Sequence, residues 1–259
     1  MGMESMLKIR LIPVLLLKNG RMVKPKQFGA SGERDVGFPT TTANIYNSQD
    51  ADELIFLDIN ATNESRSFLT NTLIEVAKKC FIPLTVGGGI KTLQDIDILL
   101  KNGADKISIN SAAIENPNLI LECSKKFGSQ CIVISIDVKK NQSNQYEVFS
   151  HRGTIPTGLD PVAWAKKCVE NGAGEILLTN IDREGLMQGY DLDLIKEVSD
   201  AVSVPVIANG GAGTREHFVE GIKQGHASAV AASSIFHFTD SNLTQVKSFI
   251  SNSGISMRS

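Results

Sequence analysis

Residues 82–113 and residues 204–235 share one pattern, and this repeat limits the possible folds more than any other feature of the chain. A shift of 122 positions superimposes Pro83 on Pro205, Gly88 and Gly89 on Gly210 and Gly211, Gly103 on Gly225, and Ser111 on Ser233. Each copy has a β-branched run, a glycine turn, an amphipathic helix that ends at a glycine, and a second apolar run. Segments 53–60 and 175–182 match at the same shift. The sequence therefore predicts two similar halves.

Strand-like and helical segments alternate along the chain. We expect strands at 9–17, 54–59, 84–86, 106–110, 131–137, 175–181, 204–208 and 228–234, and helices at 43–53, 65–80, 92–102, 116–127, 161–172, 192–202, 214–225 and 242–254. Such alternation requires βα crossovers and a parallel sheet. The matched halves favour a closed (β/α)8 barrel, a TIM barrel, over an open doubly wound sheet. We expect one domain over residues 1–259, with half-barrels at about 8–128 and 129–255.

Two polar segments interrupt this alternation. Residues 19–42 are rich in glycine and too long for a structural turn, so we expect a functional or mobile loop. Whether that loop closes over the site is left open. Residues 139–158 alternate weakly between apolar and polar side chains, which predicts a small hairpin insertion.

The bulk composition excludes several classes of protein. The net charge of −2 comes without a basic stripe, so we expect neither nucleic acid nor a membrane as partner. Residues 1–10 lack the apolar core of a signal peptide, and no run approaches 18 apolar residues. The cysteines, at positions 80, 123, 131 and 168, show no C-x-x-C pairing. We therefore expect reduced thiols in a cytoplasmic protein with no metal and no cofactor, and we assign no role to the four histidines.

In such barrels the active site lies at the carboxyl ends of the strands. Those ends carry glycines and small polar residues that favour two phosphate cradles, because only glycine lets the main chain approach an anion closely. The first cradle comprises Gly89, Asn110 and Ser111, and the second comprises Gly185, Gly210, Gly211, Ala232 and Ser233. Two cradles suit a substrate phosphorylated at both ends. The alternative is that these glycines only form tight βα turns.

Carboxylates also stand at strand ends. Asp137 follows the apolar run 131–136, where it could exchange protons with a substrate, or cap a helix, or pair with Lys139. Asp58 and Asp182 occupy similar positions, and support or capping is as good an explanation for them as catalysis. Thr179 lies near the carboxyl end of the predicted strand 175–181, on the same face of the barrel as these carboxylates.

The opposite, amino-terminal strand ends carry four charged residues: Arg10, Glu53, Lys106 and Glu175. They could ring the bottom of the barrel. The alternative is that they are solvated strand ends paired as surface ions.

Nearly the whole chain, from about residue 8 to 255, resembles the cyclase subunit of imidazole glycerol phosphate synthase. The resemblance rests on the segments IPVLLLKNGRMVK, ELIFLDINAT, VGGGI, GADKISINSAAIENP, FGSQCIVISID, GAGEILLTNIDREGLMQGYD, NGGAG and AASSIFHF. The family fold is a (β/α)8 barrel of two half-barrels. Its members bind a glutaminase subunit at the bottom face and pass ammonia up the barrel axis to a doubly phosphorylated aminoimidazole-carboxamide ribotide, which gives imidazole glycerol phosphate.

The resemblance assigns roles to the residues already singled out. The four charged residues at the bottom match the family's ammonia gate, and the glycine-rich cradles match its phosphate sites. Asp137 matches one of two catalytic aspartates. The other is missing, because Leu16 stands where the family pattern I-P-C-L-D-V has its aspartate. Leucine cannot transfer a proton, and loss of one member of an acid–base pair typically costs about 10²–10⁴-fold in rate.

Two further departures lie on the same face. Phe38 replaces a family acid in the loop 19–42, which is two residues longer than the family pattern, and Glu184 replaces an aspartate in a substrate-binding loop. The leading hypothesis is therefore a cyclase-subunit-like protein that pairs with a glutaminase and receives ammonia, with weakened or lost cyclase activity. By family analogy it could feed a sugar amidotransferase in surface-polysaccharide (lipopolysaccharide) biosynthesis.

Three other functions remain open. The chain could be a working cyclase of histidine biosynthesis, in which another group such as Glu33 or Asp35 replaces the missing acid. It could be a phosphoribosyl isomerase of the sister barrel family, although that chemistry also needs an acid at the first strand. It could be purely structural, which the phosphate cradles oppose. The sequence does not identify the glutaminase, the final ammonia acceptor or the oligomeric state.

Overall fold

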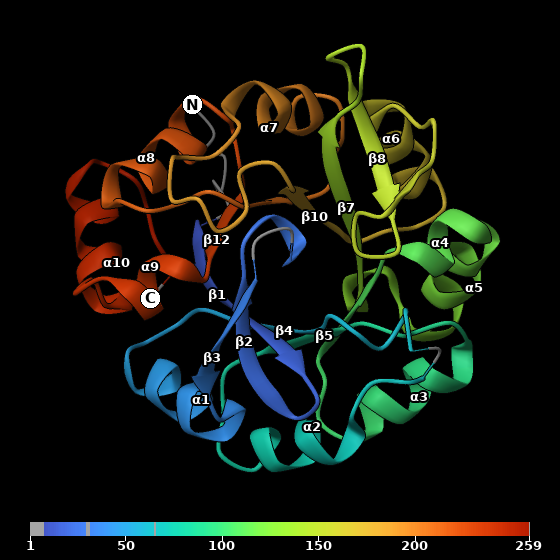
Figure 1. The fold of residues 1–259 in the computed structure, drawn as a ribbon, viewed down its shortest axis with the longest axis horizontal. Coiled ribbons are helices and arrows are strands. Elements are labelled where there is room, and N and C mark those ends of the chain that lie inside the picture. Colours follow the sequence, from blue (N-terminus) through green and yellow to red (C-terminus); the bar gives the residue numbers. More distant parts are fainter. Residues whose placement is uncertain (1–7, 30–31, 65, 259) are drawn as a thin grey trace, which may run out of the picture.

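Eight parallel strands close into a barrel in the computed structural model, which describes residues 8–29, 32–64 and 66–258. The strand order is β1, β4, β5, β6, β7, β10, β11 and β12, and β12 pairs with β1 to complete the circle. Their bounds are β1 (Arg10–Lys18), β4 (Leu54–Asp58), β5 (Leu84–Gly87), β6 (Lys106–Ile109), β7 (Ile132–Lys140), β10 (Glu175–Asn180), β11 (Val206–Asn209) and β12 (Ala229–Ala232). Figure 1 shows the helices arranged around these strands. The predicted (β/α)8 barrel is confirmed.

The helices of the outer ring follow the predicted order with different bounds. They are α1 (Pro39–Ser48), α2 (Thr70–Ala77), α3 (Leu93–Lys101), α4 (Ser111–Glu115), α5 (Asn118–Phe127), α6 (Pro161–Glu170), α7 (Leu192–Ser199), α8 (Arg215–Lys223), α9 (Ser234–Phe238) and α10 (Leu243–Asn252). The predicted helix 43–53 was wrong at both ends, because a proline fits the first turn and α1 starts at Pro39. The helix expected at 65–80 is limited to α2, and residue 65 lies outside the described residues.

The prediction of a loop without secondary structure at 19–42 was also wrong. Within it lie β2 (Arg21–Pro25), the 3₁₀ turn η1 (Gln27–Gly29) and β3 (Glu33–Gly37); residues 30–31 lie outside the described residues. Asn19 and Gly20, with φ of 52° and 75°, join β1 to β2. Positive φ at both residues of a two-residue connection is the geometry that Asn-Gly favours in hairpins. A continuous extension of β1 thus replaces the expected loop.

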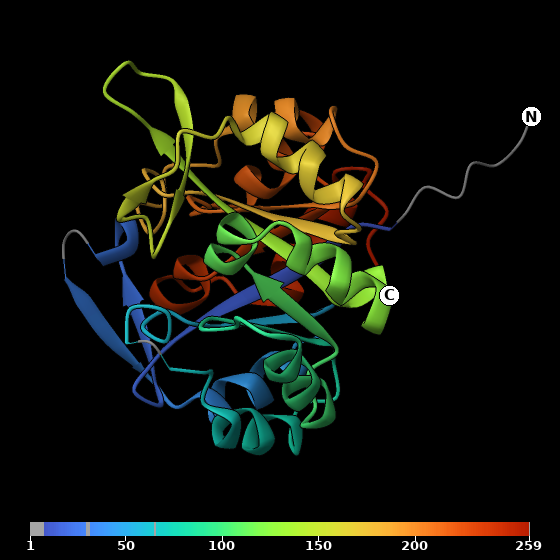
Figure 2. The ribbon, with the colours of Figure 1, turned by 90° about the vertical axis from the view of Figure 1, so that its right-hand side faces the viewer.

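Both half-barrels carry such an extension after their first strand. In the first half, β2 pairs antiparallel with β1 and β3 with β2. In the second half, β8 (Tyr146–Ser150) pairs antiparallel with β7, and β9 (Ile155–Pro156) pairs with β8, which agrees with the predicted hairpin insertion. Another 3₁₀ turn, η2 (Ser129–Cys131), precedes β7. Figure 2 shows both extensions on one side of the molecule, away from the carboxyl terminus.

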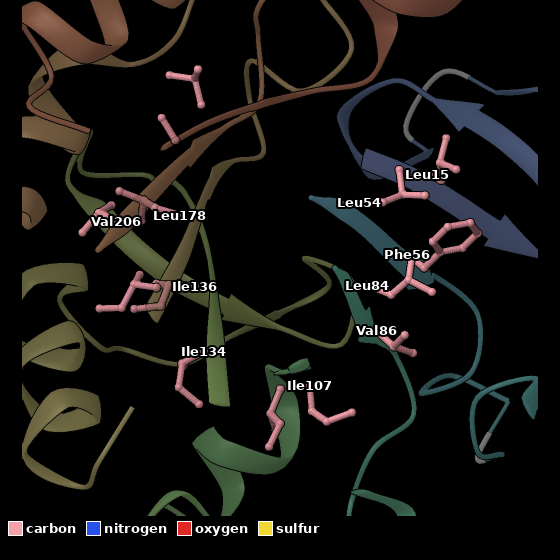
Figure 3. Close-up of a cluster of buried hydrophobic side chains, with 14 of the residues drawn as sticks. Leu15, Leu54, Phe56, Leu84, Val86, Ile107, Ile134, Ile136, Leu178 and Val206 are labelled. Carbon is pink, nitrogen blue, oxygen red and sulfur yellow. The ribbon is translucent and has the colours of Figure 1, made fainter. Parts of the chain in front are cut away.

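The barrel strands bury both of their faces. Along β1, Leu11, Leu15 and Leu17 belong to the large cluster that includes side chains of the surrounding helices, part of which appears in Figure 3. The alternate residues Ile12 and Val14, together with Leu16, belong to a second cluster with residues of the other barrel strands. Because side chains alternate across a strand, this second cluster fills the interior of the barrel. Burial on both faces explains why the first strand is continuously apolar in sequence.

In the part of the chain that the structure describes, no helix has the length and apolar character needed to cross a membrane. Residues 1–7, which include most of the segment used to predict that a signal peptide is absent, lie outside that part.

Candidate functional site

The carboxyl ends of the barrel strands surround a pocket. Of the residues predicted to form the site, those lining it are Leu16, Gly89, Asn110, Ser111, Asp137, Thr179, Glu184 and Ser233. Gly185, Gly210, Gly211 and Ala232 are not among the described residues that line it. The structure thus brings the first cradle, Asp137 and part of the second cradle to one mouth.

Asp137 is buried within β7, three residues before the strand ends at Lys140. Its Oδ2 atom accepts a 2.8 Å hydrogen bond from Nδ2 of Asn110, and its Oδ1 atom lies 3.4 Å from Oγ of Ser135. Burial is the main cause that raises the pKa of Asp137 to about 7; the hydrogen bond from Ser135 opposes this shift, and the negative charge of Glu184 adds to it. A carboxyl group with this pKa can both donate and accept a proton near neutral pH.

Leu16 points into the same mouth from β1. Its side chain belongs to the interior cluster, it is 8% exposed, and it lines the pocket together with Val14 and Leu57. An apolar surface therefore occupies the position at which a carboxylate would face the pocket from the first strand. This surface helps to exclude water but has no proton to transfer.

The first cradle is held together by contacts within the protein. Gly89 has φ of 69°, and a Cβ atom there would lie 2.3 Å from the carbonyl oxygen of Arg66. The Gly89 N–H donates to Oγ1 of Thr62 at 3.3 Å, and Oγ of Ser111 accepts a 3.0 Å hydrogen bond from the His151 N–H. Close packing of the loop after β4 thus requires a glycine at 89 with or without an anion.

The glycines of the second cradle are also closely packed against the main chain of neighbouring segments. A Cβ atom would lie 2.9 Å from the carbonyl oxygen of Pro25 at Gly185, 2.8 Å from that of Asn180 at Gly210, and 2.2 Å from that of Gly189 at Gly211. Ser233 follows Ala232 at the end of β12, and among the described residues it is the member of this cradle that lines the mouth. Tight βα packing, the alternative explanation from sequence, therefore accounts for these glycines as fully as a phosphate does.

Four charged side chains, three of them buried and that of Lys106 partly buried, form a ring at the opposite end of the barrel. Arg10 lies 2.8 Å from carboxylate oxygens of both Glu53 and Glu175, and Nζ of Lys106 lies 2.9 Å from both of them. The side chains are between 1% and 18% exposed, so they are not solvated surface ions. Burial opposes the charge of Glu53, but Lys106 and Arg10 hold the pKa of its carboxyl group below the usual value. The hydroxyl of Thr85 also donates to Glu53, from inside the barrel.

A model of the family described as "Histidine biosynthesis protein" matches residues 10–242. The chain belongs to this family. The match covers every strand of the barrel, so it includes both the mouth and the ring.

A buried ion pair at the mouth had not been predicted from the sequence. Lys24 of β2 contacts the carboxylate of Glu184 in the loop after β10, and both side chains are buried. The Gln27 N–H adds a 2.9 Å hydrogen bond to the carbonyl oxygen of Glu184. The extension formed by β2 and β3 is therefore attached to the second half of the barrel. Lys24 was missed because its segment was predicted to be a loop.

The remaining carboxylates of this face support loops. Asp58 forms two hydrogen bonds, of 2.6 and 3.0 Å, with the guanidinium group of Arg66, and Asp182 accepts from the Lys140 N–H at 3.1 Å. Asp35 forms an exposed pair with Arg21. Neither Asp35 nor Glu33, the acids considered as substitutes for the missing aspartate, is among the described residues that line the mouth.

His151 lines the mouth, although no histidine was assigned a role from sequence. Its Nδ1 atom lies 3.1 Å from Oγ of Ser150 and its Nε2 atom lies 3.4 Å from Glu115. Within residues 8–29, 32–64 and 66–258, no three His, Cys, Asp or Glu side chains are grouped so that they could hold a metal ion. The four cysteines are free thiols.

Proposed function

We propose that this protein is a cyclase-subunit-like member of the histidine biosynthesis family that pairs with a glutaminase subunit and receives ammonia through the barrel. Its own cyclase reaction is weakened or lost. The observation that carries the proposal is Leu16, an apolar side chain at the position from which the first strand would supply an acid or base to the mouth.

The lower face supports the part of the proposal that concerns ammonia. The ring of Arg10, Glu53, Lys106 and Glu175 closes the axis of the barrel with alternating charges. Lys106 is the most exposed member, at 18%, and its flexible side chain is the one that can swing aside to open the ring. Above the ring, Thr85 offers a hydroxyl group inside the barrel. Neutral ammonia crosses an apolar interior far more easily than ammonium, because burial of an unpaired charge is costly.

The upper face supports the binding of a phosphorylated small molecule rather than its full conversion. The first cradle, Ser233 and Glu184 line the mouth, whereas the acid–base pair of a cyclase is reduced to Asp137. Ammonia that reaches such a mouth is available to another acceptor. We place that acceptor in a sugar amidotransferase of surface-polysaccharide biosynthesis, by analogy with family members of this kind.

One observation favours the second candidate, an active cyclase that forms imidazole glycerol phosphate in histidine biosynthesis. Glu184 lines the mouth, and its charge contributes to the raised pKa of Asp137. A second carboxyl group beside the first is the arrangement from which an acid and a base can be made. In this candidate Glu184, held by Lys24, replaces the acid that Leu16 cannot provide.

Association with a glutaminase tests the first proposal. The purified chain is mixed with the glutaminase subunit of an imidazole glycerol phosphate synthase, and complex formation and glutamine hydrolysis are measured. We expect a complex that is lost when Glu53→Lys reverses one charge of the ring, whereas Leu16→Asp at the other end leaves it intact. Failure of the wild-type chain to bind any glutaminase offered would overturn the pairing.

A further inference from the structure

Arg152 occupies a strained turn above the first cradle. His151, Arg152 and Gly153 have φ of 49°, 58° and 72°, so three successive residues adopt the left-handed conformation. Side chains other than glycine enter this region at a cost in energy, and such strain persists where the surrounding structure enforces it. Here the His151 N–H donates to Oγ of Ser111 at 3.0 Å, which ties the turn to the cradle. The turn thus places Arg152 at the part of the mouth that Ser111 lines.

The guanidinium group of Arg152 has two partners from two other parts of the chain. Its Nη1 atom donates to Oδ1 of Asn60 at 2.8 Å, and its Nη2 atom donates to Oε1 of Glu33 at 2.5 Å. Asn60 belongs to the loop after β4, in which Thr62 accepts from the Gly89 N–H. Arg152, Thr62, Gly89 and Ser111 all line the mouth. A guanidinium group, the glycine turn at Gly89 and the hydroxyl group of Ser111 therefore line one pocket.

Glu33 brings a negative charge to this side from β3. Besides Arg152 it contacts Nζ of Lys18, and its side chain is 20% exposed. Burial opposes its charge, but the hydrogen bonds from Lys18 and Arg152 hold the pKa of Glu33 below the usual value. Glu33 is therefore an anion at neutral pH, and it accepts from the Nη2 donor of Arg152.

We propose that Arg152 is an anion-binding residue of the first cradle, and that Glu33 is an internal anion which a phosphomonoester displaces from it. Guanidinium groups bind carboxylates and phosphates through the same planar set of donors, and a phosphate dianion offers more acceptor oxygens and more charge. Asn60 keeps Arg152 oriented while the partner changes. The inference rests on the proposed function, because that function places a phosphorylated ligand at the mouth.

Calorimetric titration of the full chain with inorganic phosphate and with ribose 5-phosphate tests this. Arg152→Gln should weaken binding of both by about tenfold, the usual effect of losing a charge-assisted pair. Glu33→Gln should tighten binding by roughly threefold or more, because the competing carboxylate is gone. The double variant should bind like Arg152→Gln alone, since Glu33 acts through Arg152. The matched control is Asp35→Asn, which removes an exposed carboxylate from the same strand and should leave affinity unchanged.

Three results would overturn the proposal. These are a Glu33→Gln variant that binds phosphate no better than wild type, an Arg152→Gln variant that binds it equally well, and absence of binding in both wild type and Glu33→Gln. A folding defect is recognised by the thermal midpoint of each variant, and Arg152→Lys, which keeps the charge but not the planar donors, should then give intermediate affinity. Glutaminase association uses the opposite face, so its failure and the failure of phosphate binding are separate outcomes.

Discussion

The side-chain amide of Asn110 lies 2.8 Å from Oδ2 of Asp137, so a residue of the first cradle orients the carboxyl group that β7 brings to the mouth. One hydrogen bond thus joins the first cradle to the carboxyl group of Asp137. A phosphate that draws on Asn110 would alter the hydrogen bonding of Asp137. Under the proposed function, we therefore expect ligand binding and proton transfer by Asp137 to be coupled.

Asp137→Asn should change how stability depends on pH. The pKa of Asp137 is raised to about 7 in the folded protein, so the neutral form is favoured by folding. Stability from this group is present at low pH and is lost as pH rises through about 7, by on the order of 4 kcal/mol in the free energy of unfolding. Relative to wild type, the variant should gain stability between pH 5 and pH 8 in urea unfolding. The control is Asp97→Asn, whose exposed carboxylate pairs with Lys101 and has a lowered pKa. An equal Asp137→Asn effect at both pH values would contradict the assignment.

The buried pair of Lys24 and Glu184 should behave as a unit. Glu184→Gln leaves the ammonium group of Lys24 buried without its partner, and such a loss costs roughly 3–5 kcal/mol. The double variant Lys24→Met, Glu184→Leu removes both charges and should recover most of that loss. Unfolding in urea gives the free energy of unfolding of wild type, of each single variant and of the double variant. If the loss in the double variant equals the sum of the two single losses, the two residues do not depend on each other.

Removal of the Glu53 charge from the ring should change how the stability of the protein depends on pH. The pKa of Glu53 is below its usual value in the folded protein because Lys106 and Arg10 outweigh the effect of burial. A lowered pKa gives stability that is present above the unfolded value and is lost as pH falls through the folded value. Wild type should therefore lose stability below about pH 4.5, and Glu53→Gln should be less stable at pH 7 but lose less on acidification. Thermal midpoints between pH 7 and pH 3 test this, and parallel curves would contradict it.

Gly211→Ala should be far more damaging than Gly20→Ala. Both glycines have positive φ, at 110° and 75°, so both substitutions carry backbone strain of about 1 kcal/mol. A Cβ atom at 211 would also lie 2.2 Å from the carbonyl oxygen of Gly189, whereas nothing lies within 4 Å at Gly20. We expect a loss of about 3 kcal/mol or more for Gly211→Ala. Equal effects would mean that the loop relaxes and that close packing does not explain this glycine.

Much of the barrel and its mouth could be predicted because two sequence signals, the matched glycines and the apolar runs, are local and occur in both halves. The matched glycines and the apolar runs fix where each strand ends, and parallel strands bring their ends to one face. Asp137 and Asn110 were both predicted to lie at strand ends on this face, but their contact was not predicted.

The extension after β1 could not be predicted with the same method, because β2 and β3 are five residues each and lie in a glycine-rich segment. The Asn19–Gly20 pair was the available signal, and it was overlooked. The contacts of Lys24 with Glu184 and of Arg152 with Glu33 join positions 160 and 119 residues apart, which no local pattern reports. The helices α4 and α9, of five residues each, are too short to show a helical period.

The measurement that tests the central claim most directly is ammonia-driven turnover of the aminoimidazole-carboxamide ribotide by wild type and by Leu16→Asp. We predict that wild type is silent and that the variant gains activity, because under the proposed function the phosphate cradles and Asp137 are retained and the missing acid at position 16 is what prevents turnover. Efficient turnover by wild type would contradict the account and would favour Glu184 as the replacement acid. Silence from both would contradict it too, because the mouth would then have lost more than the group at position 16.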